Sequence, residues 1–381
     1  MGFTLLSNQR ALFDIPSDIA YFNCAYMSPL LRCAVAAGLR GMQTKSQPWS
    51  ITPSDFFSDG ERIRAAAAAV FQARGDDVAL VPSASYGLAI AARNLALTAG
   101  QEILVLAEQF PSNIYVWREL AARSGASIHT VPRPTDNNWT DAVLERIGPQ
   151  TAIAALPHCH WTDGTLVDLE AIGPILRNHG ATLVVDLTQS LGALPFDCRE
   201  IRPDFAVAAC YKWLLGPYST GVLYVAPQHQ DGAALEHNWM GRAGAQNFTR
   251  LVDYQDKFQH GARRFDVGET ANFALLPALA SALEQILTWG VVNIQETLRL
   301  MTGDIAERAR GLGLQVSDPA YRSGHFLGLR FPAGLPDGLA TRLAKQHVYV
   351  SVRGDSVRVT PHLYNTTDDI DRLFKHLGKE I

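Results

Sequence analysis

Apolar segments of strand length alternate with helical patterns through the middle of the chain, and this alternation restricts the fold more than any other feature. The predicted strands are 76–83, 101–108, 126–133, 151–160, 181–190 and 204–210. The predicted helices among them are 85–97, 113–125 and 166–180. Strands that are apolar on both sides and separated by helices are typical of a parallel sheet covered on both faces. The sequence therefore predicts an α/β fold.

The sequence after about residue 275 has a different pattern. Two long helical stretches are followed by short strands and a final helix, at 274–290, 293–313, 325–331, 348–353, 357–362 and 367–381. This order predicts a small α+β domain at 276–381, following a large domain at 46–275. Segment 1–45 is expected to pack with the small domain, because the two ends of a compact chain often lie close together.

Composition excludes several classes of protein. The formal net charge is −4 and no Lys/Arg-rich run occurs, which argues against a nucleic-acid-binding protein. No apolar run approaches the ~20 residues of a membrane helix, and the N-terminus lacks the pattern of a secretory signal. The five cysteines form no C-x-x-C pair, which favours buried thiols in a reducing compartment. We therefore expect a cytoplasmic protein without membrane or nucleic-acid partners.

Polar, aromatic or titratable residues follow the predicted strands. In parallel sheets, ligands bind outside the carboxyl ends of the strands. The segments at those ends are 83–85, 108–110, 158–163, 186–189 and 211–212. The sequence therefore predicts a site at one edge of the sheet, to which five strands contribute.

Two charged residues in these segments, Asp186 and Lys212, favour a specific cofactor. Asp186 ends the apolar run TLVVD, and Lys212 follows the apolar run ending at Cys210. Alone, Asp186 could cap a helix or form a salt bridge, and Lys212 could extend to the surface. Together, at the ends of successive strands, they should share one cleft. Pyridoxal 5'-phosphate (PLP) uses both, a lysine for its Schiff base and an acid beside its pyridine nitrogen. Burial would lower the pKa of the lysine and make it a better nucleophile.

The stretch PSASYGLAI offers a phosphate site. Small residues follow a strand there, and a helix begins at the same point. The free N–H groups and the positive dipole end of a helix N-terminus bind phosphate. The candidate donors are the backbone N–H groups near Ala84 and Ser85 and the hydroxyls of Ser83 and Ser85; a plain N-cap is the alternative interpretation.

Three stretches of the chain carry a resemblance to a known family. They are VVDLTQSLGALPFDCREIRPDFAVAACYKWLLGPYSTGVLYV, FDVGETANFALLPALASALE and VRVTPHLYNTTDDIDRL. Together they resemble the class V aminotransferases, which are fold type I PLP-dependent enzymes and include kynureninases, cysteine desulfurases and isopenicillin N epimerases. The resemblance implies a large domain with a mostly parallel seven-stranded sheet covered by helices, plus a small α+β C-terminal domain. It also implies PLP as cofactor, an amino acid as substrate, and a homodimer that shares its active site between subunits.

The resemblance implies a role for each matching residue. Lys212 would be the Schiff-base lysine and Asp186 the partner of the pyridine nitrogen. The remaining cofactor contacts would be Ser83, Ala84 and Ser85 at the phosphate, Phe110 stacked on the ring, and Asn113, Gln189, Tyr211, Trp239 and Thr270, with Thr270 lent by the neighbouring subunit. For the substrate, Arg358 would bind the carboxylate, Arg353 is a competing ligand, and Trp161 would shape the pocket. A guanidinium suits this task because it binds a carboxylate through two parallel hydrogen bonds.

Departures from the family pattern exclude some of the reactions and sites that the family could have. The stretch VYVSVRGDSVRV is short and has no cysteine, so a cysteine desulfurase that forms a persulfide is not expected. His158, Cys159 and His160 could suggest a metal, but alternate residues of a strand point to opposite faces, so we expect no metal site.

Transamination is the first hypothesis, because it requires only the lysine, the ring partners and a carboxylate-binding arginine. A kynureninase-like or cystine C–S lyase reaction is the second, and epimerisation with a second base near 158–160 is the third. A PLP-fold binding module without activity is disfavoured by Lys212, Asp186 and Arg358 occurring together. A nucleotide-binding α/β enzyme is disfavoured because VPSASYG is not a G-x-G-x-x-G motif.

Overall fold

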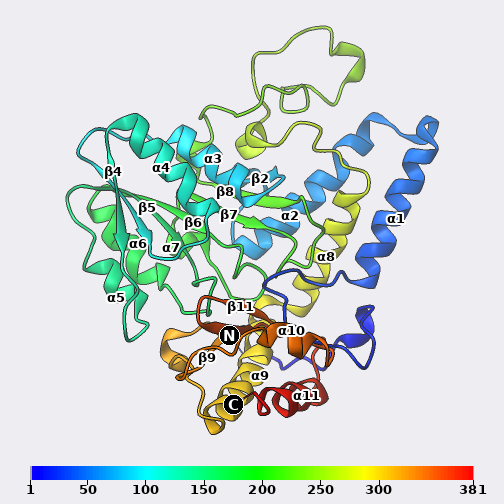
Figure 1. Ribbon diagram of the computed structural model, residues 1–381. Coiled ribbons are helices and arrows are strands. Elements are labelled where there is room, and N and C mark those ends of the chain that lie inside the picture. The colour runs from blue at the N-terminus through cyan, green and yellow to red at the C-terminus, as the bar shows by residue number, and fades with distance from the viewer. Residues whose placement is uncertain (1, 381) are drawn as a thin grey trace.

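A seven-stranded sheet forms the centre of the larger domain in the computed structural model, which describes residues 2–380 (Figure 1). Its strand order is β2-β8-β7-β6-β5-β3-β4. The strands are β2 (Val78–Val81), β3 (Glu102–Leu106), β4 (Ser127–Val131), β5 (Thr151–Pro157), β6 (Thr182–Asp186), β7 (Phe205–Ala209) and β8 (Gly221–Val225). Only β8 runs antiparallel to its neighbours, β2 and β7. The predicted mostly parallel seven-stranded sheet is therefore confirmed.

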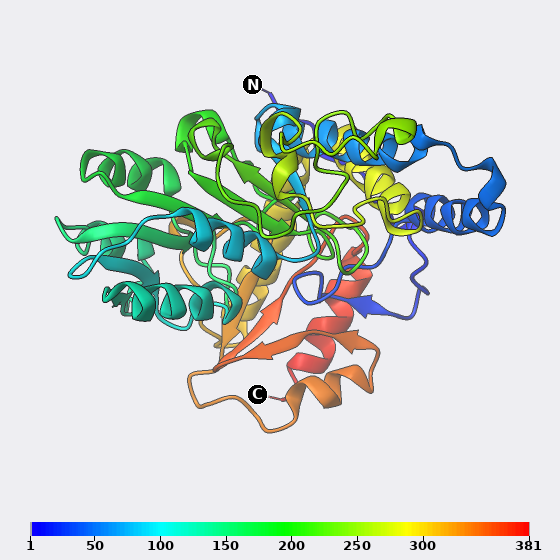
Figure 2. The same cartoon turned by 90° about the horizontal axis from the view of Figure 1, so that it is seen from above.

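Helices cover both faces of this sheet, as Figures 1 and 2 show. The helices are α1 (Arg32–Ser46), α2 (Ser58–Phe71), α3 (Ala84–Asn94), α4 (Ser112–Ser124), α5 (Trp139–Leu144), α6 (Leu169–Asn178), α7 (Cys198–Ile201) and α8 (Leu275–Trp289). Alternate residues of one strand enter different cores: Leu104 and Leu106 belong to the cluster that also contains residues of α2, α6 and α8, whereas Ile103 and Val105 belong to the cluster that contains residues of α3 and α4. This period of two explains why the central strands are apolar on both sides.

The smaller domain is built on a three-stranded antiparallel sheet of order β11-β12-β9. Its elements are α9 (Val291–Gly311), β9 (Leu327–Arg330), α10 (Leu339–Ala344), β10 (Val348–Tyr349), β11 (Ser351–Arg353), β12 (Ser356–Val359) and α11 (Thr367–Leu377). The N-terminal segment joins this domain, because β1 (Ala20–Tyr21) pairs in parallel with β10. Figure 2 shows this strand beside the orange and red C-terminal elements.

One hydrophobic core extends across the predicted domain limit. In α8, Leu279, Leu283 and Ile286, which the prediction places in the small domain, share a core cluster with strands of the large sheet and with Leu363 and Tyr364. In α9, Ile305 and Ala309 belong to the core of the small domain. The helix α1 also packs against α8, so segment 1–45 contacts both domains.

The predicted strands of the large sheet are shorter in the structure, and two predictions differ in a way that has a physical reason or changes the sheet. The strand predicted at 151–160 ends at Pro157, whose missing N–H cannot continue a ladder. The strand predicted at 348–353 divides into β10 and β11, which belong to different sheets. Between residues 2 and 380, no single helix is both long and apolar enough to cross a membrane, and α8 and α9 meet both conditions only as a pair bent by 74°.

Candidate active site

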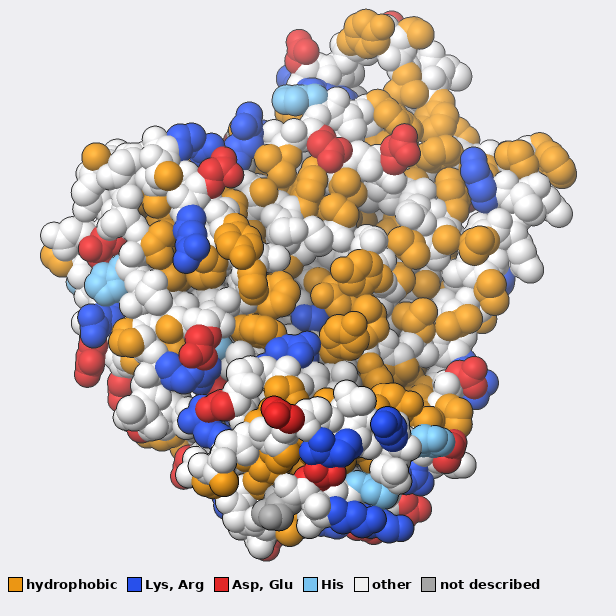
Figure 3. Space-filling model, viewed as in Figure 1, with side chains coloured by type: hydrophobic (Ala, Val, Ile, Leu, Met, Phe, Trp, Pro, Cys, Tyr) orange, Lys and Arg blue, Asp and Glu red, His pale blue; other side chains and the backbone are white. Residues whose placement is uncertain are grey.

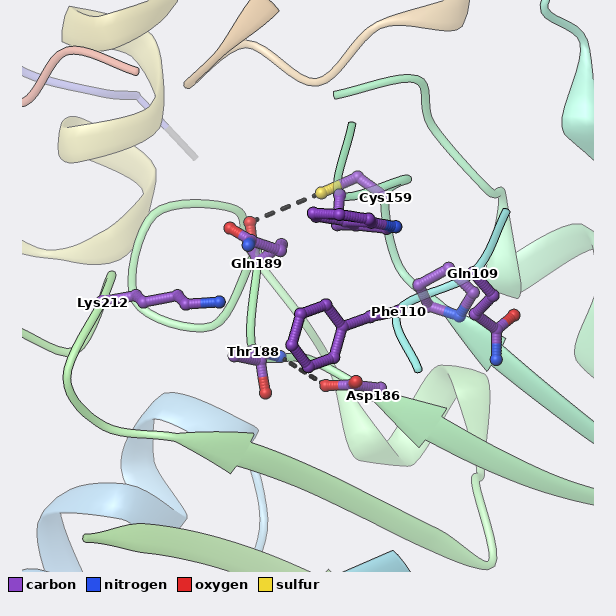
Figure 4. Close-up of a pocket in the computed structure, with 9 residues that line it drawn as sticks. Gln109, Phe110, Cys159, Asp186, Thr188, Gln189 and Lys212 are labelled. Atoms are coloured by element: carbon purple, nitrogen blue, oxygen red, sulfur yellow. Dashed lines mark hydrogen bonds between the residues drawn. The ribbon is translucent and has the colours of Figure 1, made fainter. Parts of the chain in front are cut away.

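A pocket opens at the carboxyl ends of β5, β6 and β7, where the sequence predicts the site (Figure 4). It encloses about 350 Å³ of empty space, counting its open mouth. The residues that line it are Gln109, Phe110, Pro157, Cys159, Trp161, Asp186, Thr188, Gln189 and Lys212. Five of the predicted site residues, Phe110, Trp161, Asp186, Gln189 and Lys212, therefore meet in one cavity.

Lys212 lies in a tight turn three residues beyond β7, with only 5% of its surface exposed. Its ammonium lies 5.4 Å from the Phe110 ring centre and 5.3 Å from that of Tyr211. Burial, followed by the positive charge of Arg358, lowers the pKa of Lys212 to about 8. Asp186 acts in the opposite direction but does not cancel these effects. The structure thus provides an amine that loses its proton far more easily than an ordinary lysine.

The lowered pKa predicts the pH dependence of cofactor attachment. Only the neutral amine is a nucleophile, so the rate at which the apoprotein binds PLP covalently should rise with pH about a midpoint near 8. An ordinary lysine would place that midpoint near 10.5. The measurement is the rate of absorbance change after mixing apoprotein with PLP across a pH series. A rate that still rises steeply above pH 10 would contradict a desolvated Lys212.

Asp186 ends β6 beside Lys212, because β6 and β7 are neighbours in the sheet. Its Oδ1 accepts a hydrogen bond from the backbone N–H of Thr188 at 3.0 Å. Burial raises the pKa of Asp186, and the bonds to Thr188 together with Lys212 oppose this effect. A carboxylate can accept further hydrogen bonds, so Asp186 can hold a cationic N–H donor of a ligand in the pocket. Such a donor would return the pKa of Asp186 toward its ordinary value.

Gln189 is fixed at both its side chain and its backbone. Its Nε2 donates to the carbonyl of Ala25 at 3.1 Å, and its Oε1 accepts from Trp213 Nε1 at 3.2 Å. Its backbone carbonyl accepts from His325 Nε2 at 2.7 Å and from Cys159 Sγ at 3.4 Å. The second N–H of the Gln189 amide remains available to a ligand oxygen.

Two aromatic side chains form the wall opposite β6. Phe110 and Trp161 meet edge to face with ring centres 5.3 Å apart. Trp161 is held by a hydrogen bond from its Nε1 to the carbonyl of Glu108 at 2.7 Å. Figure 4 shows Lys212 and Asp186 approaching the same space as the Phe110 ring. The pocket can therefore enclose a flat ring between Phe110 and the end of β6.

Ser83–Ser85 lie at the N-terminus of α3, directly after β2. Ser83 caps the helix by accepting from the Tyr86 N–H at 3.2 Å, and the Ser83 and Ser85 hydroxyls are 2.9 Å apart. The first N–H groups of the helix have no intrahelical partner, so they can bind an anion. Val267 pairs its N–H with the carbonyl of Leu80 on β2, and Thr270 in turn donates to the carbonyl of Val267. Thr270 thus belongs to a segment docked against the strand that leads to Ser83.

Arg358 on β12 is buried, with 1% of its surface exposed. Its Nε donates to Ser351 Oγ at 3.1 Å and its Nη1 donates to the carbonyl of Trp161 at 2.8 Å. Burial lowers its pKa to about 9, and the charge of Arg353 adds to this effect. Among residues 2–380, no carboxylate forms an ion pair with Arg358. A buried guanidinium without an acidic partner is costly, so it fits the carboxylate of a substrate.

Three other predicted cofactor contacts do not line the pocket within one chain. Tyr211 packs on Tyr218 beside Lys212, with ring centres 4.6 Å apart. Asn113 is fully buried in α4, where its Oδ1 accepts from Trp117 Nε1 at 2.8 Å. Trp239 lies in an aromatic cluster with Phe56, Phe57 and Phe248. Their roles toward the cofactor stay predictions.

The structure adds four lining residues to which the sequence assigned no role, namely Gln109, Pro157, Cys159 and Thr188. Gln109 supports the segment of Phe110, because its side chain bonds the backbone of Leu106, Asn113 and Ala155. Thr188 Oγ1 accepts from the Ala209 N–H at 3.2 Å and so joins the ends of β6 and β7. Cys159 faces the pocket. The position of Gln109 and Thr188 directly beyond strand ends was the only signal in the sequence.

The two histidines next to Cys159, His158 and His160, pack against aromatic side chains. His160 stacks on Trp139, with ring centres 5.2 Å apart, and His158 packs on Phe196. Burial lowers the pKa of His158 to about 4. In the part of the chain that the structure describes, no group of three or more His, Cys, Asp or Glu side chains is placed to hold a metal ion.

Comparison with known proteins identifies the family. Residues 52–373 match the family described as Aminotransferase class-V. The chain belongs to the class V aminotransferase family. It is 28% identical over 303 residues to an uncharacterized aminotransferase, YcbU, of Bacillus subtilis strain 168, covering 78% of this chain and 77% of that protein. It is 30% identical over 295 residues to the kynureninase of Deinococcus radiodurans, and the match covers 73% of this chain and 68% of that protein.

Solved structures share the fold. The mutant C-DES structure with glycine covalently linked to its PLP cofactor has a TM-score of 0.87 at 20% identity, covering 98% of this chain and 100% of that one. A second structure, of the cystine C–S lyase C-DES with its product cysteine persulfide, has a TM-score of 0.83 at 22% identity, covering 96% and 98%. The predicted fold type I architecture is confirmed, and the cofactor of this class V enzyme is PLP.

The residues present fit PLP. The desolvated amine of Lys212, the carboxylate of Asp186 and the free N–H of Gln189 converge on one pocket with an aromatic wall. The N-terminus of α3 at Ser83–Ser85 supplies donors for a phosphate. We therefore assign Lys212, Asp186, Gln189 and Phe110 as the groups that would hold the ring, and this assignment is a proposal.

Proposed function

We propose that this enzyme is an aminotransferase that acts on the α-amino group of an amino acid. When bound, PLP stabilises negative charge at the substrate's Cα and so makes its bonds labile. One observation carries the choice of transamination. Among the described residues that line the pocket, Lys212 is the amine whose pKa is lowered to about 8, whereas burial raises the pKa of the Cys159 thiol.

Transamination requires one base that moves a proton between two carbon atoms on the same side of the cofactor. The Lys212 amine, with a pKa of about 8, can accept and return a proton at neutral pH. Arg358 would hold the substrate's carboxylate and so fix the Cα–H bond toward Lys212. Phe110 and Trp161 would shield the reacting carbon from water.

A lyase or hydrolase reaction of the kynureninase or cystine C–S lyase kind is the second candidate. The 30% identity with a kynureninase favours it. Such a reaction would need an acid for the leaving group, and no further acid lines the pocket in the described chain. The same reasoning disfavours an epimerase, which would need a second base.

The positions and pKa values of the five cysteine thiols disfavour a desulfurase that forms a persulfide. The turn between β11 and β12 consists of Gly354 and Asp355. Cys24, Cys159, Cys198 and Cys210 are buried, and burial raises the pKa of each. Cys33 is exposed, but it lies on α1. A thiol with a raised pKa is a poor nucleophile.

Transfer of labelled nitrogen tests the proposal. The holoenzyme is incubated with ¹⁵N-labelled amino acids and a mixture of 2-oxo acids, and the products are examined by mass spectrometry. The proposal expects ¹⁵N in a new amino acid, formed in equal amount to the oxo acid of the donor. Release of ¹⁵N-ammonia with no labelled amino acid would support the lyase alternative instead.

Substitution of Arg358 tests the carboxylate site. Arg358→Ala should raise the amino-acid KM by about 10- to 100-fold, the loss expected for charge-assisted hydrogen bonds, with PLP content unchanged. The measurement is initial rate against donor concentration. Arg62→Ala, at an exposed ion pair with Asp59, is the matched control. An unchanged KM would move the carboxylate site to Arg353.

We also propose a cytoplasmic homodimer with shared active sites. Several large apolar side chains are exposed, including Trp49, Trp239, Val252 and Tyr254. Figure 3 shows hydrophobic side chains spread over the face that carries α1 and the loop above it. Exposed apolar areas of this kind mark protein–protein contacts. A second subunit seated there would bring Trp239 and Thr270 toward a neighbouring pocket.

A further inference from the structure

The hairpin of β11 and β12 carries two arginines on one face. Ser351 pairs with Arg358 and Arg353 pairs with Ser356. Paired residues, and residues two apart along one strand, point to the same side of a sheet. The opposite side carries Val352 and Val357, which pack in the core of the small domain. Arg353 and Arg358 are therefore diagonal neighbours on the polar face of the hairpin.

This face is turned toward the active site. Arg358 donates to the backbone of Trp161, and the guanidinium of Arg353 lies 5.6 Å from the centre of the Trp161 ring. Trp161 lines the pocket and packs on Phe110. Both positive charges therefore adjoin the substrate side of the cavity. In the view of Figure 3, Lys and Arg side chains lie near the middle of the molecule, between the two domains.

Neither arginine has an acidic partner in the described chain, unlike nearby arginines. Arg330, on the adjacent strand β9, forms an ion pair with Asp355 at 3.1 Å. Arg133 forms one with Asp163 at 2.7 Å. The hydrogen bond that Arg353 makes is to the carbonyl of its own neighbour, Val352, at 2.6 Å.

Two neighbouring positive charges repel, and partial burial strengthens the repulsion. Arg353 is half-buried, and burial lowers its pKa. The charge of Arg353 in turn lowers the pKa of Arg358. One substrate carboxylate at Arg358 would relieve part of this repulsion. A second anionic group at Arg353 would relieve the rest.

We propose that Arg353 binds a second anionic group, so that the substrates of this enzyme are amino acids with an acidic side chain and the matching dicarboxylic oxo acids. This inference rests on the proposed function, in which Arg358 binds the α-carboxylate. Trp161 lies against both guanidinium groups and separates the two carboxylates. Arg353 is then the residue that selects acidic over neutral substrates.

Binding of unreactive acids to the holoenzyme tests the inference without turnover. The probes are succinate and glutarate, which have two carboxylates, and butyrate, which has one. Dissociation constants are taken from the change in the cofactor's visible absorption. We expect wild-type enzyme to bind at least one dicarboxylate about tenfold or more tightly than butyrate, the contribution of one charge-assisted pair.

Three variants assign the effect to a residue. Arg353→Gln should remove the dicarboxylate advantage and leave butyrate binding unchanged, and Arg353→Lys should keep part of the advantage. Arg330→Gln is the matched control, since its charge is already paired with Asp355. Equal binding of all probes by wild-type enzyme would overturn the inference. An equal loss for butyrate and dicarboxylates in Arg353→Gln would also overturn it, because Arg353 would then serve the first carboxylate.

The outcomes separate this inference from the proposed function. Preference for dicarboxylates in an enzyme that releases ammonia would keep the Arg353 site and reject transamination. Amino transfer with neutral amino acids, together with equal binding of the probes, would keep transamination and reject the Arg353 site.

Discussion

Lys212→Ala is expected to lower kcat by about 10³-fold or more, because it removes both the attachment point of PLP and the proton-transfer group. No other lysine lines the pocket among residues 2–380. PLP should still bind without a covalent bond, through Asp186, Gln189 and the N-terminus of α3. Steady-state kinetics gives the loss of rate. Mass spectrometry after borohydride reduction should find no pyridoxyl group on the variant.

The fold should survive this substitution. Lys212 is buried and, among residues 2–380, its ammonium forms no salt bridge but lies over the Phe110 and Tyr211 rings, so its removal takes away a desolvated cation. Lys345→Ala, at an exposed lysine in the small domain, is the matched control and should keep both activity and Tm. A Lys212→Ala enzyme with wild-type kcat would reject the assignment of Lys212.

Asp186→Asn should lower kcat by about 10²-fold or more, while Tm of the apoprotein does not fall. The charge of Asp186 favours a protonated pyridine nitrogen, and an amide cannot replace it. In the apoprotein, however, the carboxylate is buried and its pKa is raised by burial, so a neutral side chain of the same shape removes a desolvation cost. The substitution should therefore lower kcat of the holoenzyme without lowering Tm of the apoprotein.

Parallel measurements of kcat for the holoenzyme and Tm for the apoprotein check both signs. Asp204→Asn is a useful comparison. Asp204 also lies at a strand end, but it bonds the backbone N–H of Leu183 and the side chain of His229, so its substitution should lower Tm and leave kcat almost unchanged. A large loss of Tm with normal kcat in Asp186→Asn would make Asp186 a structural residue.

The sheet and the pairing of Asp186 with Lys212 follow from the sequence for a physical reason. Strands buried on both faces have continuous apolar runs, and the carboxyl ends of parallel strands meet at one edge. Since β6 and β7 are adjacent, the residues that follow them had to meet. A lysine and an acid meeting at that edge already favoured PLP, and the resemblance of the stretch from Val184 to Val225 added the family.

Other features depend on contacts that no local pattern reveals. The position of β8 between β2 and β7 depends on its pairing with β2, which is far from it in sequence. The core that α8 shares with the strands of the large sheet also depends on such contacts, and the predicted domain limit stays a prediction. The shared face of Arg353 and Arg358 requires the register of β11 and β12. The roles of Trp239 and Thr270 require a second subunit and stay predictions.

A single half-reaction tests the central claim most directly. Holoenzyme is mixed with an amino acid in the absence of any acceptor, and the cofactor, oxo acid and ammonia are quantified. The proposed aminotransferase predicts pyridoxamine phosphate and oxo acid in a 1:1 ratio to enzyme sites, with no ammonia. Ammonia that accumulates beyond one equivalent while the cofactor remains PLP would contradict it.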